Sequence, residues 1–223
     1  CDGGDLAGTS CVALGFGGGT LGCAPDCSDF VTTGCTAPVV PVSCAAVGSS
    51  VDGNYTIDPD GDGGSPAFQV YCADMASTPT EYLNLIVTGG TNNYSYYVYT
   101  SLPTAATCNW TKVRFASLSP LRLDGSDRRF ATCTGNASWF AACHWATAQS
   151  CMCGGCSQGR MNIDLTGTPF RIDAAAGWET VGWIPGGGVT RNDGPGRIVE
   201  ATGGGYCGGT QPRNPPGLIL AFF

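Results

Sequence analysis

Residues 143–170, CHWATAQSCMCGGCSQGRMNIDLTGTPF, combine a cluster of cysteines and the only histidine with the clearest strand pattern in the chain. Met161, Ile163 and Leu165 alternate with polar residues, and the alternation resumes at Phe170 after a Gly-Thr-Pro turn. A period of two is typical of half-buried strands, so the pattern predicts a β-hairpin. A cysteine cluster that runs into a strand pair would anchor the sheet that the rest of the chain joins.

The composition predicts a mainly β, disulfide-rich protein with antiparallel sheets and little helix. The 35 glycines and 14 prolines imply many turns, and a hydrophobic content of 43% is sufficient for a core. Fourteen cysteines with a single histidine indicate an oxidising compartment, and therefore an extracellular or cell-surface protein. All fourteen are expected in disulfides: Cys1, Cys11, Cys23, Cys27, Cys35, Cys44, Cys72, Cys108, Cys133, Cys143, Cys151, Cys153, Cys156 and Cys207.

The charge of the chain argues against two classes of partner. The net charge is −7, the pI is near 4.4 and Lys112 is the only lysine, which disfavours binding to nucleic acid or to anionic membranes. No apolar run is long enough to span a bilayer, so no membrane insertion is expected. No signal peptide is recognisable, and the chain is interpreted as a mature or trimmed product.

The distribution of cysteine and proline predicts two domains. Residues 1–36 hold five cysteines among glycines and aspartates, and a module of this size must be stapled because it cannot bury much core. Short strand-like pieces are expected on either side of its glycine turn at 17–19. Residues 37–43, APVVPVS, form an extended linker to a β domain at 44–223.

The first residue allows two interpretations. Cys1 followed by Asp2 is what a bacterial lipoprotein shows after signal cleavage, with Cys1 acylated. That would leave an odd number of cysteines for pairing, so a disulfide at Cys1 is favoured.

Further patterns predict the other elements of the β domain. They are hairpins at 52–75 and 81–100, strands at 112–115 and 121–124, strands around Trp183 and Ile198, a short helix within 133–156 and a buried closing strand in the final GLILAFF. The glycines around Cys207 imply a backbone approach that side chains would block.

The turn of the first hairpin is a candidate calcium site. Asp58, Asp60 and Asp62 alternate with Pro59 and Gly61, so their carboxylates could face one ion. A full EF-hand loop needs a glutamate at its twelfth position, where this chain has Gln69. A solvated acidic turn is the favoured alternative, and calcium is the only cofactor considered.

Tyr94, Tyr96, Tyr97 and Tyr99 are candidates for a ligand platform that stacks on a sugar. Alternate residues of a strand face opposite sides, so about half of these rings are expected to be core or cross-strand partners instead.

His144, Cys151, Cys153 and Cys156 could hold a tetrahedral zinc, because they offer one nitrogen and three sulfurs. An oxidising compartment favours disulfides over zinc. Catalytic residues are not expected, since the chain has one histidine, no HExxH, no GxSxG and only three glutamates without a motif around them.

Four acceptor patterns for N-glycosylation begin at Asn54, Asn93, Asn109 and Asn136. In a bacterial protein this pattern is usually idle, and sequences rich in Asn and Thr produce it by chance.

Two short segments resemble known modules. Residues 52–75 are similar to the opening hairpin of fibrinogen-like domains, whose flanking cysteines pair, and this resemblance implies a Cys44–Cys72 disulfide. Residues 1–36 resemble the Cys-rich modules repeated in secreted and surface proteins of myxobacteria. Those modules usually begin with a further cysteine, which implies either a missing N-terminal portion or pairing of Cys1 within the block.

Residues 44–223 as a whole resemble the GON domain, which ends a subset of secreted ADAMTS-type metalloproteases. The shared segments, in the expected order, are CADM at 72–75, EYLNL at 81–85, KVRF at 112–115, CSQGRMNIDLTGTPF at 156–170, GW at 177–178, GGYCG at 204–208 and GLILAF at 217–222. The resemblance implies a secreted accessory domain without catalytic residues. Thr210 stands where the family pattern has a second cysteine, so a different partner is expected for Cys207.

The sequence therefore predicts a non-enzymatic binding or adhesion module of a larger extracellular protein, with a protein or a glycan as partner. The second hypothesis is a homo-oligomeric subunit of an extracellular fibre or matrix, because low charge and many disulfides suit a durable assembly. A zinc-binding accessory domain is the third.

Overall fold

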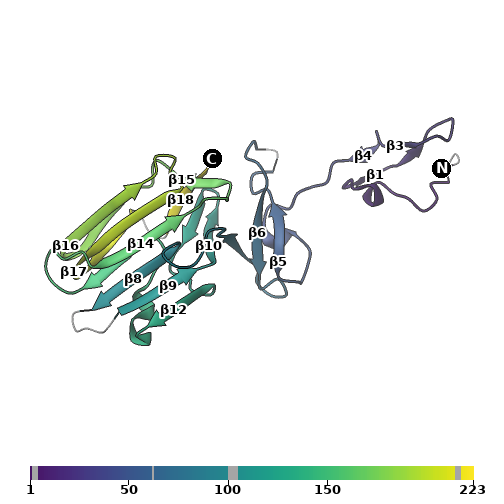
Figure 1. Ribbon diagram of the computed structural model, residues 1–223. Coiled ribbons are helices and arrows are strands. Elements are labelled where there is room, and N and C mark those ends of the chain that lie inside the picture. The colour runs from purple at the N-terminus through teal and green to yellow at the C-terminus, as the bar shows by residue number, and fades with distance from the viewer. Residues whose placement is uncertain (2–4, 62, 100–104, 214–216) are drawn as a thin grey trace. The chain divides into compact units, whose positions relative to one another are not determined.

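The computed structural model describes residues 1, 5–61, 63–99, 105–213 and 217–223. The chain divides into two compact units, Cys1–Pro41 and Val42–Phe223 (Figure 1). The boundary lies within the segment 37–43 that the sequence indicates as a linker.

The N-terminal unit consists of short elements held by disulfides. Strand β1 (Gly18–Gly19) pairs with β4 (Cys35–Thr36), and β2 (Gly22–Cys23) pairs with β3 (Phe30–Val31). The residues before the glycine turn form a 3-10 helix, η1 (Val12–Leu14), where the sequence analysis expects a strand-like piece. Val12 and Leu14 are exposed, so no sheet face exists there to favour a strand.

The second unit is almost entirely β-structure, which confirms the predicted fold class. The helices among its described residues are the short 3-10 segments η2 (Cys44–Ala46) and η3 (Ala137–Ala142). Its strands are β5 (Gly53–Ile57), β6 (Phe68–Ala73), β7 (Thr80–Asn84), β8 (Tyr94–Tyr99), β9 (Ala105–Trp110), β10 (Lys112–Leu118), β11 (Leu121–Asp124), β12 (Ala131–Gly135), β13 (Ala148–Cys151), β14 (Gly159–Asp164), β15 (Phe170–Ile172), β16 (Trp178–Asn192), β17 (Ile198–Pro212) and β18 (Leu218–Phe222).

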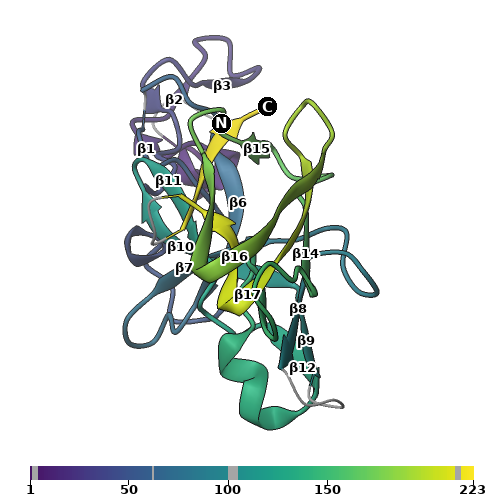
Figure 2. The ribbon, with the colours of Figure 1, turned by 90° about the vertical axis from the view of Figure 1, so that its left-hand side faces the viewer.

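These strands form two sheets. The first has the order β15-β18-β11-β10-β7-β6-β5, and the second has the order β12-β9-β8-β13-β17-β14 with β16 added on β17 (Figure 1). All pairings of described strands are antiparallel except that of β13 with β8, which is parallel. Figure 2 shows η3 beside the β9–β12 end of the second sheet. Residues from both sheets contribute to one hydrophobic core, including Phe68 and Leu83 from the first and Ile163 from the second.

Two of the predicted hairpins are wrong in their pairing although their strands are present. Strands β7 and β8 lie in different sheets, and so do β14 and β15. The segments 85–93 and 165–169 are therefore corners at which the chain crosses from one sheet to the other. The alternation of β14 reflects its two faces, but its neighbours are β8 and β17, so β15 is free to pair with the closing strand β18.

The two corners are held together by one asparagine. Asn93 is fully buried and has a left-handed backbone (φ +48°). Its Nδ2 donates to the carbonyls of Val87 (2.8 Å) and Asp164 (2.7 Å), and its Oδ1 accepts from Asp164 N–H (3.0 Å) and Trp145 Nε1 (3.1 Å). The backbone N–H of Asn93 donates to Asn162 Oδ1. All the polar atoms of this side chain are thus used inside the fold.

This burial corrects one of the glycosylation candidates. Asn93 begins an acceptor pattern, but its amide nitrogen already donates two hydrogen bonds in the core. Asn93 therefore cannot carry a glycan in the folded protein.

The corners also touch directly. Gly167 has a φ of +85°, and a Cβ at this position would lie 3.1 Å from side-chain atoms of Ile86. A side chain at 167 would thus push corner 165–169 away from corner 85–93, which explains a glycine there.

Twelve of the cysteines form six disulfides. The N-terminal unit contains Cys1–Cys23 and Cys11–Cys35. The second unit contains Cys44–Cys72, Cys108–Cys133, Cys151–Cys207 and Cys153–Cys156. Cys44–Cys72 is the pair that the fibrinogen-like resemblance implies, and Cys207 has a partner on β13.

The expected participation of all fourteen cysteines is not what the structure shows. Cys27 is exposed and Cys143 is buried, and neither is part of the six bridges. Cys143 Sγ lies 3.6 Å from the carbonyl oxygen of Ala106 in the core, and burial raises the pKa of its thiol to about 11.

Replacing Asn93 with alanine is expected to lower the free energy of unfolding by roughly 3 kcal/mol or more, because several buried donors and acceptors lose their partners. The measurement is a urea unfolding curve, with Asn54→Ala as the control at an exposed asparagine. Equal midpoints for the two variants would show that the corners do not depend on Asn93.

Cys143 is expected to resist alkylation by iodoacetamide in the native protein. With a pKa of about 11, only about one thiol in a thousand is ionised at about pH 8, and the sulfur is buried. Unfolding without reductant should make Cys143 reactive at once, as peptide mapping by mass spectrometry would show. Recovery of Cys143 in a disulfide-linked peptide would contradict the assignment.

Candidate functional site

Two exposed aromatic side chains form a pair on β16 and β17. Trp183 is 72% exposed and Tyr206 is 45% exposed, and their ring centroids lie 5.1 Å apart. Ile184, at 51% exposure, extends the same apolar surface. We call Trp183, Ile184 and Tyr206 the aromatic patch. Exposed large apolar groups gathered in this way mark an interaction site more often than scattered ones do.

The local backbone turns these side chains outward. The β16–β17 register shifts on both sides of Trp183, and Ile184 has a left-handed backbone (φ +48°). Bulges of this kind re-aim side chains and are frequent next to functional sites. Cys207, beside Tyr206, is fixed to β13 by its disulfide with Cys151.

The glycines around the patch allow the strands beneath it to lie close. A Cβ on Gly203 would collide with the carbonyl oxygen of Ala148, and one on Gly204 would collide with Ser150 Oγ and Cys156 O. The predicted close approach of this glycine run is therefore confirmed. Gly154, in the loop closed by Cys153–Cys156, leaves room for the side chains of Ile184 and Tyr206.

Strand β16 is an edge of the sheet within the described part of the chain, since it pairs with β17 alone. Residues 180–190, TVGWIPGGGVT, carry no charge. Pro185 and the register shifts limit the pairing of this edge with another strand, as is usual for exposed edges. The patch thus presents uncharged side chains rather than a free ladder of backbone groups.

The structure does not bring the four candidate tyrosines to one surface. Tyr97 is buried and Tyr99 stacks on Trp139 with ring centroids 4.5 Å apart. Tyr94 and Tyr96 lie on the opposite face of β8, next to β14. Alternate residues of β8 face opposite sides of the sheet, as expected, and this separates the four rings into two pairs.

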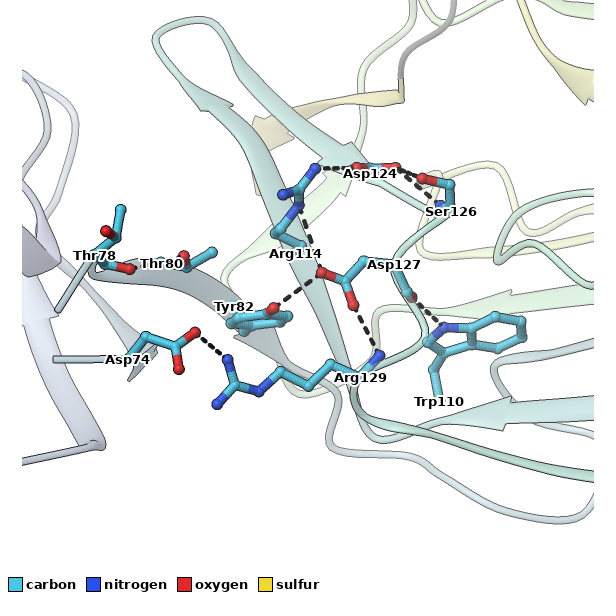
Figure 3. A network of polar contacts seen from close by, with 10 residues as sticks. All are labelled: Asp74, Thr78, Thr80, Tyr82, Trp110, Arg114, Asp124, Ser126, Asp127 and Arg129. Carbon is cyan, nitrogen blue, oxygen red and sulfur yellow. Dashed lines mark hydrogen bonds and ion pairs between the residues drawn. The ribbon is translucent and has the colours of Figure 1, made fainter. Parts of the chain in front are cut away.

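A half-buried polar network ties β7, β10 and β11 to the segment after β11. Tyr82 Oη donates to Asp127 Oδ2 (2.9 Å), and Trp110 Nε1 donates to the carbonyl of Asp127 (2.9 Å). Arg114 pairs with Asp124, and Arg129 pairs with Asp74 (Figure 3).

The hydrogen bonds and ion pairs of this network shift the pKa values of its members. Burial and the hydrogen bond to Asp127 raise the pKa of Tyr82 to about 12. Burial alone would raise the pKa of Asp124, but hydrogen bonds from Ser126 and Arg114 outweigh it and hold this pKa below the ordinary value. Each charged side chain here has an ion-pair partner within the fold, although Arg114 Nε makes no hydrogen bond, and we assign the network to stability.

A cavity of about 240 Å³ brings Asp124, Ser126 and His144 near one another. These are the residue types of a nucleophilic triad, but their hydrogen bonds are not those that a triad requires. Ser126 Oγ donates to Asp124 Oδ1 (2.6 Å), and His144 Nε2 lies 3.1 Å from the Ala141 carbonyl. Burial, with Arg128 nearby, lowers the pKa of His144. In the described contacts the serine is bonded to the carboxylate and not to the imidazole, so no base activates it.

The metal candidates are placed as follows. Asp58 and Asp60 lie in the turn after β5, where Asp60 Oδ2 accepts from Ser65 N–H (3.2 Å), and Asp62 lies outside the described residues. Of the zinc candidates, Cys153 and Cys156 are bridged to each other and Cys151 is bridged to Cys207. Those sulfurs therefore cannot act as thiolate ligands.

The other asparagine candidates lie nearer the surface. Asn54 is exposed and accepts from Asn84 Nδ2, and Asn109 donates to the carbonyl of Gly90. Asn136 caps η3, because its side chain accepts from Ser138 N–H.

The sequence pattern predicts a strand at Trp183. It predicts neither the exposure of the Trp183 side chain nor its contact with Tyr206. One signal was present: a tryptophan within the uncharged run GWIPGGG, rich in glycine and proline, has few apolar neighbours with which to form a core. Nothing in the sequence indicated that Tyr206 lies opposite it.

The fold and its exposed patch define a class: a disulfide-stapled, two-sheet β domain with no helix long and apolar enough to cross a membrane in the described residues. The family profile of the GON domain matches residues 42–111 and 99–222. The chain therefore belongs to the GON domain family, as the sequence motifs indicate.

One curated relative is "A disintegrin and metalloproteinase with thrombospondin motifs 20" of Homo sapiens, which is 28% identical over 193 residues. The match covers 76% of this chain and 10% of the human protein, so the chain spans a small part of that relative's length. No solved structure matches the chain.

Replacing Asp124 with asparagine is expected to destabilise the protein by about 1–2 kcal/mol at about pH 6, because a buried carboxylate loses charged hydrogen bonds. The folded-state pKa of Asp124 is depressed below 3.8, so its contribution is complete above that value and is lost as the pH falls through the folded pKa. The stability difference between wild type and variant should shrink at about pH 2.5.

The control for this comparison is Glu200→Gln, which breaks the exposed Arg191–Glu200 pair. Its effect should be below about 0.5 kcal/mol at neutral pH. A difference for Asp124→Asn that persists undiminished in acid would refute the charged role of Asp124.

Proposed function

We propose that this chain is a non-catalytic extracellular recognition module that binds another protein through the aromatic patch. The observation that carries the proposal is the exposed Trp183–Tyr206 pair on a disulfide-fixed hairpin. Tryptophan and tyrosine dominate the energetic centres of protein interfaces, because they bury a large area with few rotatable bonds.

An extracellular location is supported by the six disulfides, which persist in oxidising compartments. Membership of the GON domain family agrees with that location. The absence of catalytic function is supported by the bonding of Ser126 and His144, which leaves neither poised for reaction.

A protein partner fits this surface better than a polyanion or a membrane does. The patch has no charged side chain in residues 180–190, and the chain as a whole carries a net charge of −7. Association would therefore depend on burial of Trp183, Ile184 and Tyr206 rather than on steering by charge.

Self-association is a second candidate, and the edge position of β16 favours it. An exposed edge strand can pair with the same strand of a second copy, which gives a symmetric dimer or a growing filament. Pro185 and the register shifts reduce the length of edge that can pair, which makes a different protein the better-supported partner.

The test compares wild type with Trp183→Ala and with Val51→Ala, a control at another exposed apolar residue. The fluorescently labelled chain is titrated onto intact cells or extracellular matrix of the producing organism. Trp183→Ala should weaken saturable binding at least about tenfold, and Val51→Ala should leave it unchanged. Equal binding by wild type and Trp183→Ala would exclude the patch as the docking surface.

The oligomeric state separates the two candidates. Sedimentation of the wild type across a wide concentration range should give a monomer if the patch receives another protein. A concentration-dependent oligomer that Trp183→Ala abolishes would replace the recognition module by the self-assembling subunit.

A further inference from the structure

The second sheet carries a polar cavity on the face that points away from the core. It has a volume of about 290 Å³. It is lined by Thr91, Tyr94, Arg160, Asn162, Thr190 and Glu200, and also by the apolar residues Met161 and Ala201. It involves none of the residues of the aromatic patch. A volume near 300 Å³ is the lower end of the range for small-molecule sites and suits a single small ligand.

The strand register explains why these residues meet. Asn162 of β14 lies opposite Tyr94 of β8 on one side and Glu200 of β17 on the other. Two residues along, Arg160 lies between Tyr96 and Thr202 in the same way. Because alternate residues share a face, both rows project on the same side of the sheet.

The opposite faces of the same strands confirm which side this is. Met161, Ile163 and Val199 are buried in the core. The rows at 160 and 162 therefore lie on the other face of the sheet. Arg160 is exposed there and Tyr94 is half-buried, whereas Asn162 is buried and its Oδ1 accepts from Asn93 N–H.

The cavity offers one uncommitted cation. Among the described residues no carboxylate lies within 4.0 Å of the Arg160 guanidinium, whereas Arg191 is paired with Glu200 at 3.0 Å. A guanidinium binds a carboxylate through two parallel hydrogen bonds, and that is the group this position fits best.

The remaining lining fits hydroxyl groups. The Glu200 carboxylate accepts hydrogen bonds, and the Thr91 hydroxyl can donate and accept. The Thr190 hydroxyl donates to the Glu200 carbonyl (3.2 Å) and can still accept, and the Tyr94 ring offers an apolar surface. Arg160 and Glu200 are both close enough to affect the pKa of Tyr94, which burial raises. Because Glu200 is already paired with Arg191, Arg160 is the one cation of the described lining left to balance a ligand's charge, and a ligand with a single negative charge is favoured.

We propose that this cavity binds a carboxylated monosaccharide unit, such as a hexuronic acid, with the carboxylate on Arg160 and the sugar hydroxyls toward Glu200 and the threonines. The aromatic patch and this cavity are then two separate sites. One binds protein through apolar contact, and the other binds one acidic sugar of a glycan.

The probe is glucuronic acid, titrated into the full chain and followed by backbone amide shifts in NMR, with glucose as the uncharged analogue. Binding of glucuronic acid should exceed that of glucose and should weaken with added salt, because one ion pair distinguishes them. Arg160→Gln should weaken glucuronic acid binding at least about tenfold and remove most of its advantage over glucose.

Two controls separate the site from trivial effects. Arg171→Gln removes another exposed arginine, on β15 in the other sheet, and should bind like wild type. Trp183→Ala should also leave sugar binding unchanged. The sugar site and the protein-binding patch can therefore be tested independently of each other. Arg160→Lys keeps the charge but loses the fork, and should bind with intermediate strength.

Three results would overturn the proposal. They are no saturable shift of the cavity residues with glucuronic acid, equal loss in Arg160→Gln and Arg171→Gln, or binding of acetate as strong as that of glucuronic acid. The last would reduce the site to a carboxylate contact without sugar recognition.

Discussion

The hydrogen bonds of Asn93 are the constraint on which the two-sheet arrangement depends. One buried side chain joins corner 85–93 to Asp164, next to corner 165–169, and to Trp145 of the cysteine-rich stretch. A buried amide is costly unless all its bonds are made, so this cluster is stable in one arrangement only. That arrangement sends β8 and β14 into one sheet and β7 and β15 into the other, and the same asparagine fixes Asn162 on β14. The polar cavity on the outer face therefore rests on the corner geometry.

Much of the fold could be predicted from the sequence, because alternation reports the two faces of a strand. The strands at 53–57, 68–73, 112–118 and 218–222 lie where the patterns indicate them. Alternation does not indicate which other strand a given strand pairs with. Segments 85–93 and 165–169 contain the Gly, Asn, Thr and Pro residues typical of hairpin turns, and a sheet-to-sheet corner uses the same residues. The deciding contact, Asp164 with Asn93, joins residues far apart in the sequence.

The cysteines show a related limit. An even number of cysteines suggests that all of them form disulfides. This holds only when every cysteine folds next to a partner. Cys143 lies in the core of the second unit and Cys27 is exposed in the first, and neither is part of the six bridges. The Cys108–Cys133 bridge joins directly opposed residues of β9 and β12, beside the core in which Cys143 behaves as a small apolar side chain.

Low charge explains why the candidate sites could not be read from motifs. With charged residues at 12% of the chain, solubility rests on glycines, threonines and exposed backbone. The residues around a tryptophan in such a sequence therefore do not indicate whether its side chain is buried or exposed. The register decides instead. It places Arg160, Asn162 and Tyr94 on one outward face, and its shifts around Trp183 turn that ring into solvent. A protein of this composition locates its recognition surfaces through strand pairing, and a single slipped residue would move every one of these side chains to the opposite face.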